Sequence, residues 1–285
     1  MTPLVVMAVL LAAFSHAAWN ALAHTMSDQV AAFTLIGGGA TLIGLVSAVF
    51  VPFPDRGAWP YLLVSAVLHA GYQVLLARSF KLGAFGQVYP IARGTAPLAV
   101  TLIAALFLHE SLDAYQGAGV GLACAGLLGV ALWGIRTAVT KPNPLALTAA
   151  FATGLTIAGY TVIDGLGVRA SGNSFSYLAW LMILEGLPIP IYARIARGPA
   201  LWGQLKPWAA RGLAGAALSM LAYGLVLWAQ TRADLAPVAA LRESSIIVGA
   251  AIGALLFKEH FGAPRIAAAA LMVTGIGLML HAGSA

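Results

Sequence analysis

The feature that most constrains this chain is a nearly unbroken series of apolar stretches, each about 20 residues long. A helix needs about 20 apolar residues to cross the hydrocarbon core of a bilayer. Hydrophobic residues make up 61% of the 285 positions and charged residues only 8%, whereas soluble domains are about a quarter charged. So few charges cannot cover a water-facing surface, which excludes a soluble enzyme, a secreted disulfide domain and a disordered tail. The sequence therefore predicts an integral membrane protein.

We expect an all-α polytopic membrane protein with ten transmembrane helices. The breaks between the apolar stretches hold turn-forming or charged residues, as in 25–28, 141–144 and 171–174. The alternating polarity of transmembrane β-strands is absent from the sequence. The predicted spans lie near 3–23, 30–52, 60–80, 84–108, 112–135, 145–167, 175–193, 209–230, 235–257 and 263–282.

Two segments of the chain indicate an internal repeat. The sequence FLHE that ends at Glu110 is similar to LFKE, which ends at Glu259, and the two lie 149 residues apart. The same offset relates Arg93 to Arg242, so in each half an arginine stands 17 residues before a glutamate that ends the same span. This spacing predicts two related halves, 1–139 and 144–285.

Five helices in each half have a topological consequence. An odd number of crossings makes the second half enter the membrane upside down, which gives the inverted repeat of many secondary transporters. Substrate sites in such folds lie near the bilayer midplane, between the repeats. The predicted symmetry is the strongest structural indication of transport.

The chain carries 15 basic and 9 acidic residues. Most of the basic residues fall in short loops, where they fix orientation, so we expect no nucleic-acid partner. Ten of them lie in the loops on one side of the predicted topology and three on the other side. By the positive-inside rule this distribution places both termini outside.

Ionisable residues within the spans are the candidates for function, because a charge at the centre of a membrane helix costs about 2.5–3.5 kcal/mol. Arg93 and Arg242 are interpreted as a pair of clamps, since guanidinium binds carboxylate or phosphonate with two parallel hydrogen bonds. The alternative is a static ion pair with an acidic residue of a neighbouring helix. The residues that we single out are His16, Arg93, Asp164, Glu185, Arg242 and Glu243.

Glu243 and Glu185 are the candidate proton carriers, because a buried carboxyl can titrate in a working pH range. The alternative is that each has an arginine partner and never changes protonation. Asp164 is interpreted as a helix-end residue. Glu110 and Glu259 are expected to cap or tether loops.

Polar and aromatic side chains could line a binding site. His16 and Asn20 are four residues apart and so share one face of the first helix; they could contact a solute or bond a neighbouring helix. The aromatic candidates could equally pack or anchor the interface. The spacing of Gly117 with Gly121, and of Gly249 with Gly253, predicts close helix contacts. The aromatic candidates are Trp19, Tyr72, Tyr89, Tyr160, Tyr223 and Trp228.

Signals of enzyme chemistry are missing from the sequence. There is no group of His, Cys and Asp with metal-ligand spacing and no glycine-rich phosphate loop. Ser244 and Ser245 follow Glu243, but no histidine is placed to act as their base. We therefore expect a protein that is not an enzyme and needs no cofactor or metal.

These residues resemble a known family, the EamA-type transporters of the drug/metabolite transporter superfamily. In that family a glutamate closes helices 4 and 9 and a glycine-rich helix follows, as at Glu110 and Glu259. A narrower subgroup shares the motifs HAxWN, VYPxARG and ALRE, which occur here at 16–20, 88–94 and 240–243. The resemblance covers nearly the whole chain.

The resemblance implies a central cavity lined by helices 1, 3, 4, 6, 8 and 9, and a bacterial inner membrane protein. Some members of the subgroup are associated with phosphonate utilisation. Family members usually have cytoplasmic termini, which contradicts the charge distribution of the loops. The residues that the resemblance implies as cavity lining are His16, Asn20, Tyr72, Arg93, Tyr160, Tyr223 and Arg242.

The sequence thus predicts a secondary transporter of a small polar metabolite that carries a carboxylate or phosphonate, working by alternating access, with a proton as the expected driving ion. Its partners would be that solute and the lipid bilayer. Three rivals remain open: a transporter of organic cations with an aromatic cage, a flippase for a lipid-linked group, and an intramembrane enzyme.

Overall fold

A computed structural model describes residues 1–83, 85–136, 143–256 and 263–281. Within these ranges the secondary structure is helical throughout, with no strand. The chain therefore has the all-α architecture that its composition predicts. The α-helices are α1 Pro3–His24, α2 Gln29–Phe50, α3 Trp59–Leu82, α4 Phe85–Phe107, α5 Ala114–Arg136, α6 Pro144–Ala170, α7 Ser174–Gly186, α8 Pro188–Arg197, α9 Leu201–Leu205, α10 Ala209–Gln230, α11 Leu235–Arg242, α12 Ser245–Leu256 and α13 Ala263–His281.

Local sequence sets where several helices begin. Asp28 accepts hydrogen bonds from the backbone N–H groups of Val30 and Ala31 at 3.0 and 3.1 Å, and so caps α2. Asn143, followed by proline at the first helical position, caps α6 in the same way. Asn173 caps α7. The turn residues read from the sequence are therefore the groups that satisfy the first amides of these helices.

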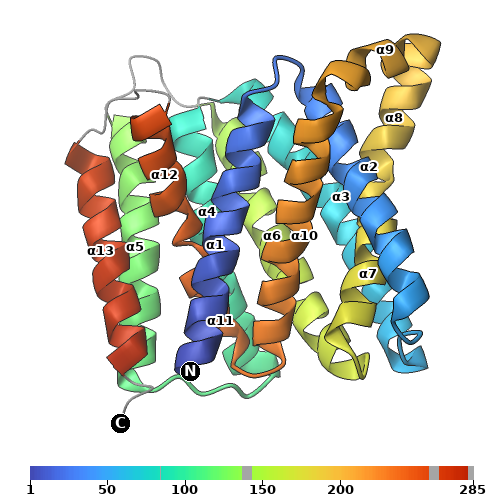
Figure 1. Cartoon of the computed structure of the whole chain (residues 1–285). Coiled ribbons are helices and arrows are strands. Elements are labelled where there is room, and N and C mark those ends of the chain that lie inside the picture. The colour runs from blue at the N-terminus through green and yellow to red at the C-terminus, as the bar shows by residue number, and fades with distance from the viewer. Residues whose placement is uncertain (84, 137–142, 257–262, 282–285) are drawn as a thin grey trace.

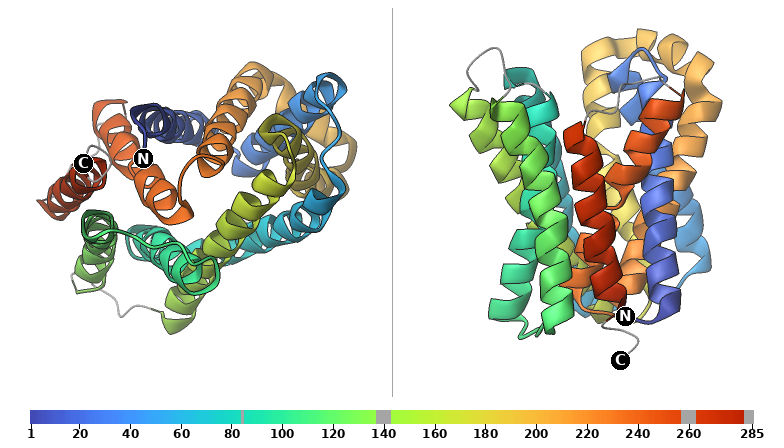
Figure 2. Two further views of the ribbon diagram at one scale, coloured as in Figure 1. Left: turned by 90° about the horizontal axis from the view of Figure 1, so that it is seen from below. Right: turned by 90° about the vertical axis from the view of Figure 1, so that its left-hand side faces the viewer.

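The helices form two rows that face each other. Viewed along the bundle axis in Figure 2 (left), one row holds α4, α6 and α3, and the other holds α11 with α12, α1 and α10. Within the rows, α3 packs on α6, and α1 packs on α10. At one end of the rows α5 packs on α13, and at the other α2 packs on α7. The N-terminus and the end of α13 lie at the same end of the bundle (Figure 1).

Two predicted spans are broken inside the bundle. The span predicted at 235–257 is divided into α11 and α12, and α12 follows above α11 in Figure 1. The span predicted at 175–193 is divided into α7 and α8 at Leu187, just before Pro188. Both breaks were absent from the prediction, because each span was placed by its overall apolar length, which a few polar residues or a proline do not interrupt.

Seven stretches of the described residues are long and apolar enough to cross a membrane, and Ile266–Met279 is a shorter apolar helix. The last of the seven, Ser174–Gln230, takes in everything from α7 to α10. The chain is therefore a polytopic helical membrane protein. Glu259, which the sequence analysis singled out, lies outside the described residues.

The glycines that bring α5 and α13 together differ from those that the spacing indicated. A Cβ atom on Gly119 would stand 2.5 Å from the carbonyl oxygen of Gly275, whereas Gly117 and Gly121 face open space. Gly126 meets the carbonyl oxygen of Ala268 in the same way, at 2.9 Å. The GxxxG prediction at Gly117 and Gly121 was wrong, because spacing cannot tell which side of a helix faces its neighbour.

Candidate functional site

Between the two rows lies a buried group of charges, Arg93, Arg242 and Glu243, which we call the arginine cluster. Arg93 Nε lies 2.8 Å from Glu243 Oε2, and Arg242 Nε lies 3.8 Å from Glu243 Oε1. All three residues are less than 10% exposed. Arg93 also donates a hydrogen bond from Nη2 to Ser245 Oγ at 3.3 Å. The two arginines that the internal repeat relates to each other therefore both lie beside the carboxylate of Glu243.

The charges of the arginine cluster do not balance. Two guanidinium groups carry two positive charges and Glu243 carries one negative charge, which leaves a net charge of plus one. Neither Nε–H is aligned for a hydrogen bond with Glu243, and both carboxylate oxygens are without a hydrogen-bond donor among the described residues. The cluster thus combines an uncompensated positive charge with unsatisfied polar atoms.

The local backbone explains the position of these side chains. Around Glu243 the chain forms tighter turns, with N–H groups of Glu243, Ser244 and Ile246 bonding to carbonyls three residues earlier. This break places Arg242 at the end of α11 and Ser245 at the start of α12. Arg93 is held in α4 where that helix crosses α6 closely, because Gly154 leaves room for the backbone of α4.

Other predicted residues surround the arginine cluster. His16 on α1 lies within electrostatic reach of both Arg93 and Arg242, and so does Tyr72 on α3. Tyr89 lies within reach of Arg93 and Glu243. Their convergence from three helices agrees with a shared site, which remains a prediction.

Asn20 is placed differently from that group. Its side chain is exposed, and its Nδ2 atom donates to the backbone carbonyl of His16 at 2.8 Å. Its amide is therefore used within its own helix.

A second buried polar group, which we call the acidic cluster, consists of His69, Glu185 and Asp164. His69 Nε2 lies 3.1 Å from Glu185 Oε2. Asp164 is fully buried and accepts hydrogen bonds from the hydroxyls of Tyr177, at 2.8 Å, and of Tyr223. Four helices, α3, α6, α7 and α10, contribute to this cluster and its partners.

The acidic cluster corrects one prediction and reveals an omission. Asp164 is not a helix-end residue, since α6 continues to Ala170 and the carboxyl faces tyrosines of two other helices. His69 was not singled out, although it lies inside an apolar span as His16 does. Its position inside an apolar span was the feature that could have identified it. Tyr177 was also not among the aromatic candidates.

Tyr160 stands between the two clusters. Its ring stacks on that of His69, with centroids 4.0 Å apart, and Tyr72 meets it edge-on at 5.8 Å. Both arginines, Glu243 and Glu185 act on Tyr160 electrostatically. Tyr160 therefore connects the positively charged arginine cluster with the acidic cluster.

The loop residue Glu110 has the tethering role that the sequence suggested. Its Oε2 atom accepts a hydrogen bond from the N–H of Leu235 at 2.8 Å, at the start of α11, and its Oε1 atom lies 3.5 Å from Arg169. Burial raises the pKa of this carboxyl. Glu110 thus ties the loop after α4 to the ends of α6 and α11.

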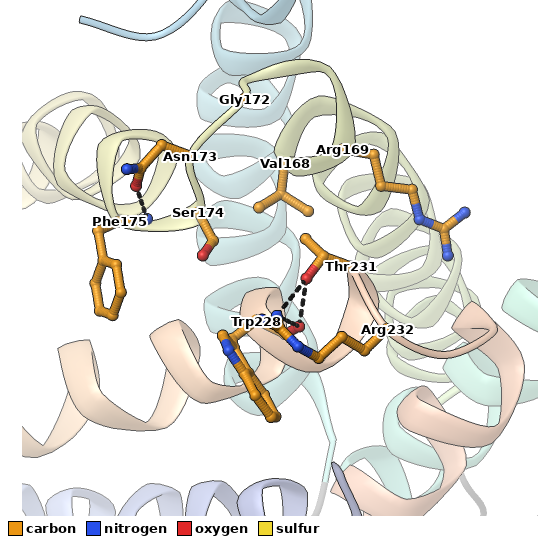
Figure 3. A pocket seen from close by; sticks show the side chains of 9 residues that line it. All are labelled: Val168, Arg169, Gly172, Asn173, Ser174, Phe175, Trp228, Thr231 and Arg232. Atoms are coloured by element: carbon orange, nitrogen blue, oxygen red, sulfur yellow. Dashed lines mark hydrogen bonds between the residues drawn. The ribbon is translucent and has the colours of Figure 1, made fainter. Parts of the chain in front are cut away.

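A pocket of about 500 Å³ lies where α6 and α10 end (Figure 3). Turns after α6 and α10 form it, and Arg232 lies over the Trp228 ring at 4.2 Å. Of the aromatic candidates only Trp228 lines this pocket, and the predicted solute-binding and proton-coupling residues do not. It is a separate feature from the two clusters.

No group of three or more His, Cys, Asp or Glu residues suited to a metal ion occurs among the residues that the structure describes. The polar interior consists instead of ion pairs and tyrosine hydroxyls inside an apolar helical bundle. Buried charges of this kind within membrane helices mark substrate or ion pathways. The structure is therefore that of a polytopic helical membrane protein with a charged group in its interior.

The chain belongs to the EamA-like transporter family, whose model matches residues 3–132 and again 144–281. One solved crystal structure, described only as that of a protein, shares the fold with a TM-score of 0.73 and 17% sequence identity, over 96% of this chain and 98% of that one. No curated protein matches the chain. The chain is thus a membrane transporter of small molecules and not an enzyme, as its residues suggested.

Proposed function

We propose that the chain is a secondary transporter that binds a small metabolite through a carboxylate or phosphonate at the arginine cluster. The observation that carries this proposal is the sharing of one buried carboxylate by two buried guanidinium groups. A buried charge without a partner is unfavourable in a membrane protein. An anionic group from the solute would supply the second negative charge.

The donor atoms support recognition of a planar or tetrahedral anion. Each guanidinium has five N–H donors in a rigid fork. Arg93 uses one on Ser245, and the contacts with Glu243 lack hydrogen-bond alignment. With respect to the residues that the structure describes, several donors of each arginine therefore remain for a solute. Tyr72, Tyr89, Tyr160, Tyr223 and His16 would surround the rest of the molecule.

Alternating access would use ten crossings arranged as two inverted repeats, 1–139 and 144–285. An offset of 149 residues converts the pair Gly119–Gly275 into Ala268–Gly126, and both pairs are close backbone contacts between α5 and α13. The same offset carries α3 onto α10 and α6 onto α1, so it exchanges the two rows. Such a two-fold relation supports rocking of one repeat against the other around a central site.

Proton coupling would involve Glu185 in preference to Glu243. Glu243 is the counter-charge of both arginines, whereas Glu185 contacts His69 and no arginine among the described residues. The lipid bilayer concerned would be the cytoplasmic membrane of a bacterium, in line with the resemblance of the motifs.

Ligand-induced thermal stabilisation of the purified protein tests the proposal. A panel of amino acids, aminophosphonates, dicarboxylates and quaternary amines is added to wild type, to Arg242→Ala and to Arg211→Ala, an exposed control. A solute at a hundred times its dissociation constant adds about 2.7 kcal/mol to stability. We expect an anionic or zwitterionic solute to stabilise wild type and Arg211→Ala but not Arg242→Ala.

A second candidate function, transport of an organic cation, is favoured by one observation. The rings of His69, Tyr160, Tyr72 and Tyr223 gather beside Glu185, and aromatic faces with a nearby carboxylate suit a quaternary amine. Stabilisation by quaternary amines alone, undiminished in Arg242→Ala, would select this function.

A further inference from the structure

The acidic cluster is separate from the arginine cluster. In it, His69 and Glu185 face each other with atoms that cannot both be hydrogen-bond acceptors. His69 Nδ1 lies 3.0 Å from the carbonyl oxygen of Ser65, which can only accept a hydrogen bond. The hydroxyl of Ser65, 3.2 Å from the same nitrogen, can also accept a hydrogen bond from it. Nδ1 therefore carries the hydrogen of the imidazole ring.

This assignment leaves the other ring nitrogen facing a carboxylate. In a neutral imidazole with hydrogen on Nδ1, the Nε2 atom is an acceptor. It stands 3.1 Å from Glu185 Oε2, an oxygen without any hydrogen-bond donor among the described residues. Two acceptors at this distance repel each other. A proton on either atom removes the repulsion.

The net charge of the acidic cluster also indicates that it holds a proton. Glu185 and Asp164 are two carboxyls, and His69 is the single basic group beside them. Within the described ranges no Lys or Arg lies at ion-pair distance from either carboxyl, since Glu185 pairs with His69 alone and Asp164 with tyrosine hydroxyls. With both carboxyls ionised, even a protonated His69 leaves one negative charge uncompensated in the interior.

The groups around the cluster are otherwise neutral. Each packed helix presents a hydroxyl, which donates a hydrogen bond or stacks but brings no charge. They are Ser65 on α3, Tyr160 on α6, Tyr177 on α7, Tyr223 on α10 and Thr41 on α2, the last of which bonds to the carbonyl of Met182. The charged residues Arg93 and Arg242 act on the region across Tyr160.

We propose that His69, Glu185 and Asp164 form the proton-binding site of the transporter, with the transported proton held between His69 Nε2 and Glu185 Oε2. The proton enters this site from one side of the membrane and leaves to the other, so no co-reactant is needed. Its link to the solute is Tyr160, because a charged imidazole on the ring face alters the interaction of that ring with its neighbours. This inference rests on the proposed transport function for its physiological role.

Infrared titration of the purified full-length protein in lipid tests the site without any solute. The measured signal is the C=O stretch of protonated carboxyl groups as a function of pH. We expect wild type to show a titrating carboxylic-acid band that is lost in Glu185→Gln and retained in Asp113→Asn, an exposed control. In His69→Gln, which keeps both carboxyls, the midpoint of the titration should move by about one pH unit or more.

Two outcomes would overturn the proposal. One is a spectrum in which neither Glu185→Gln nor Asp164→Asn changes the titrating band. The other is a His69→Gln midpoint equal to that of wild type, which decides the question even where the carboxyl variants fail to fold. A confirmed proton site in a protein that no anionic or zwitterionic solute stabilises would refute the proposed substrate class and leave the proton site standing.

Where such a solute is found, proteoliposomes extend the test with 2-aminoethylphosphonate as the probe. We expect uptake driven by a pH gradient to fall at least tenfold in Glu185→Gln, when it is expressed relative to the exchange of labelled for unlabelled probe by the same variant. Undiminished pH-driven uptake in Glu185→Gln would contradict the proton site.

Discussion

Arg93 and Glu243 meet across the two rows of helices, with Nε and Oε2 2.8 Å apart. Arg93 belongs to the first half of the chain and Glu243 to the second. The ion pair therefore lies at the interface that alternating access would open and close. Any solute anion that replaced or joined Glu243 at the guanidinium groups would act directly on that interface.

Glu243→Gln should strongly destabilise the protein. The substitution keeps the shape of the side chain but leaves two buried guanidinium groups without their counter-charge, and such losses cost about 3–5 kcal/mol. Denaturant unfolding of the purified variant measures the effect, with the exposed Asp113→Asn as a control. A Glu243→Gln protein as stable as wild type would mean that the arginines have another partner.

Gly119→Ala should destabilise the packing of α5 against α13, whereas Gly117→Ala should not. The new methyl group at 119 would stand 2.5 Å from a backbone oxygen of Gly275, and the backbone cannot move aside cheaply. Overpacking of this kind costs about 1–3 kcal/mol. Gly117 has open space around it, so alanine there is the matched control. Equal melting temperatures for the two variants would disprove the contact.

Glu110→Ala should weaken the start of α11 more than Asp234→Ala does. Asp234 occupies the N-cap position but makes no side-chain capping bond, whereas Glu110 accepts from Leu235 N–H. Loss of a cap costs about 0.5–2 kcal/mol. Hydrogen exchange at the first amides of α11 reports the change locally. Faster exchange in Asp234→Ala than in Glu110→Ala would show that Asp234, and not Glu110, caps α11.

The ion pair of Asp28 with Arg197 should make stability depend on pH in the acid range. Its hydrogen bonds with Arg197 lower the pKa of Asp28 from 3.8 to about 2. Because the folded-state pKa is the lower one, the pair stabilises the fold above about pH 4, and this stabilisation is lost as the pH falls towards 2.

Asp28→Asn isolates that effect, since asparagine still caps α2. Thermal unfolding of wild type and Asp28→Asn should differ above about pH 4 and converge near pH 2. A constant difference between the two proteins across this range would show that the ion pair does not titrate as expected.

Local properties of the sequence were sufficient for the fold class and for several residues. Apolar length and the scarcity of charge predicted a helical membrane protein, and the motifs identified its family. Depth within a span singled out Arg93, Arg242, Glu185 and Glu243, because a charge inside a membrane helix always requires a partner. Cap residues such as Asp28 were readable because they act on the next few amides.

Only the tertiary structure decided which partner each of these groups has. The contacts of Arg93 with Glu243 and of His69 with Glu185 join helices far apart in the chain, and their existence depends on how each helix is rotated about its axis. The burial of Asp164, the break before Ser245 and the choice of Gly119 over Gly117 follow from the same rotations. Hydropathy specifies that a helix crosses the membrane, but packing against neighbours specifies which face it presents.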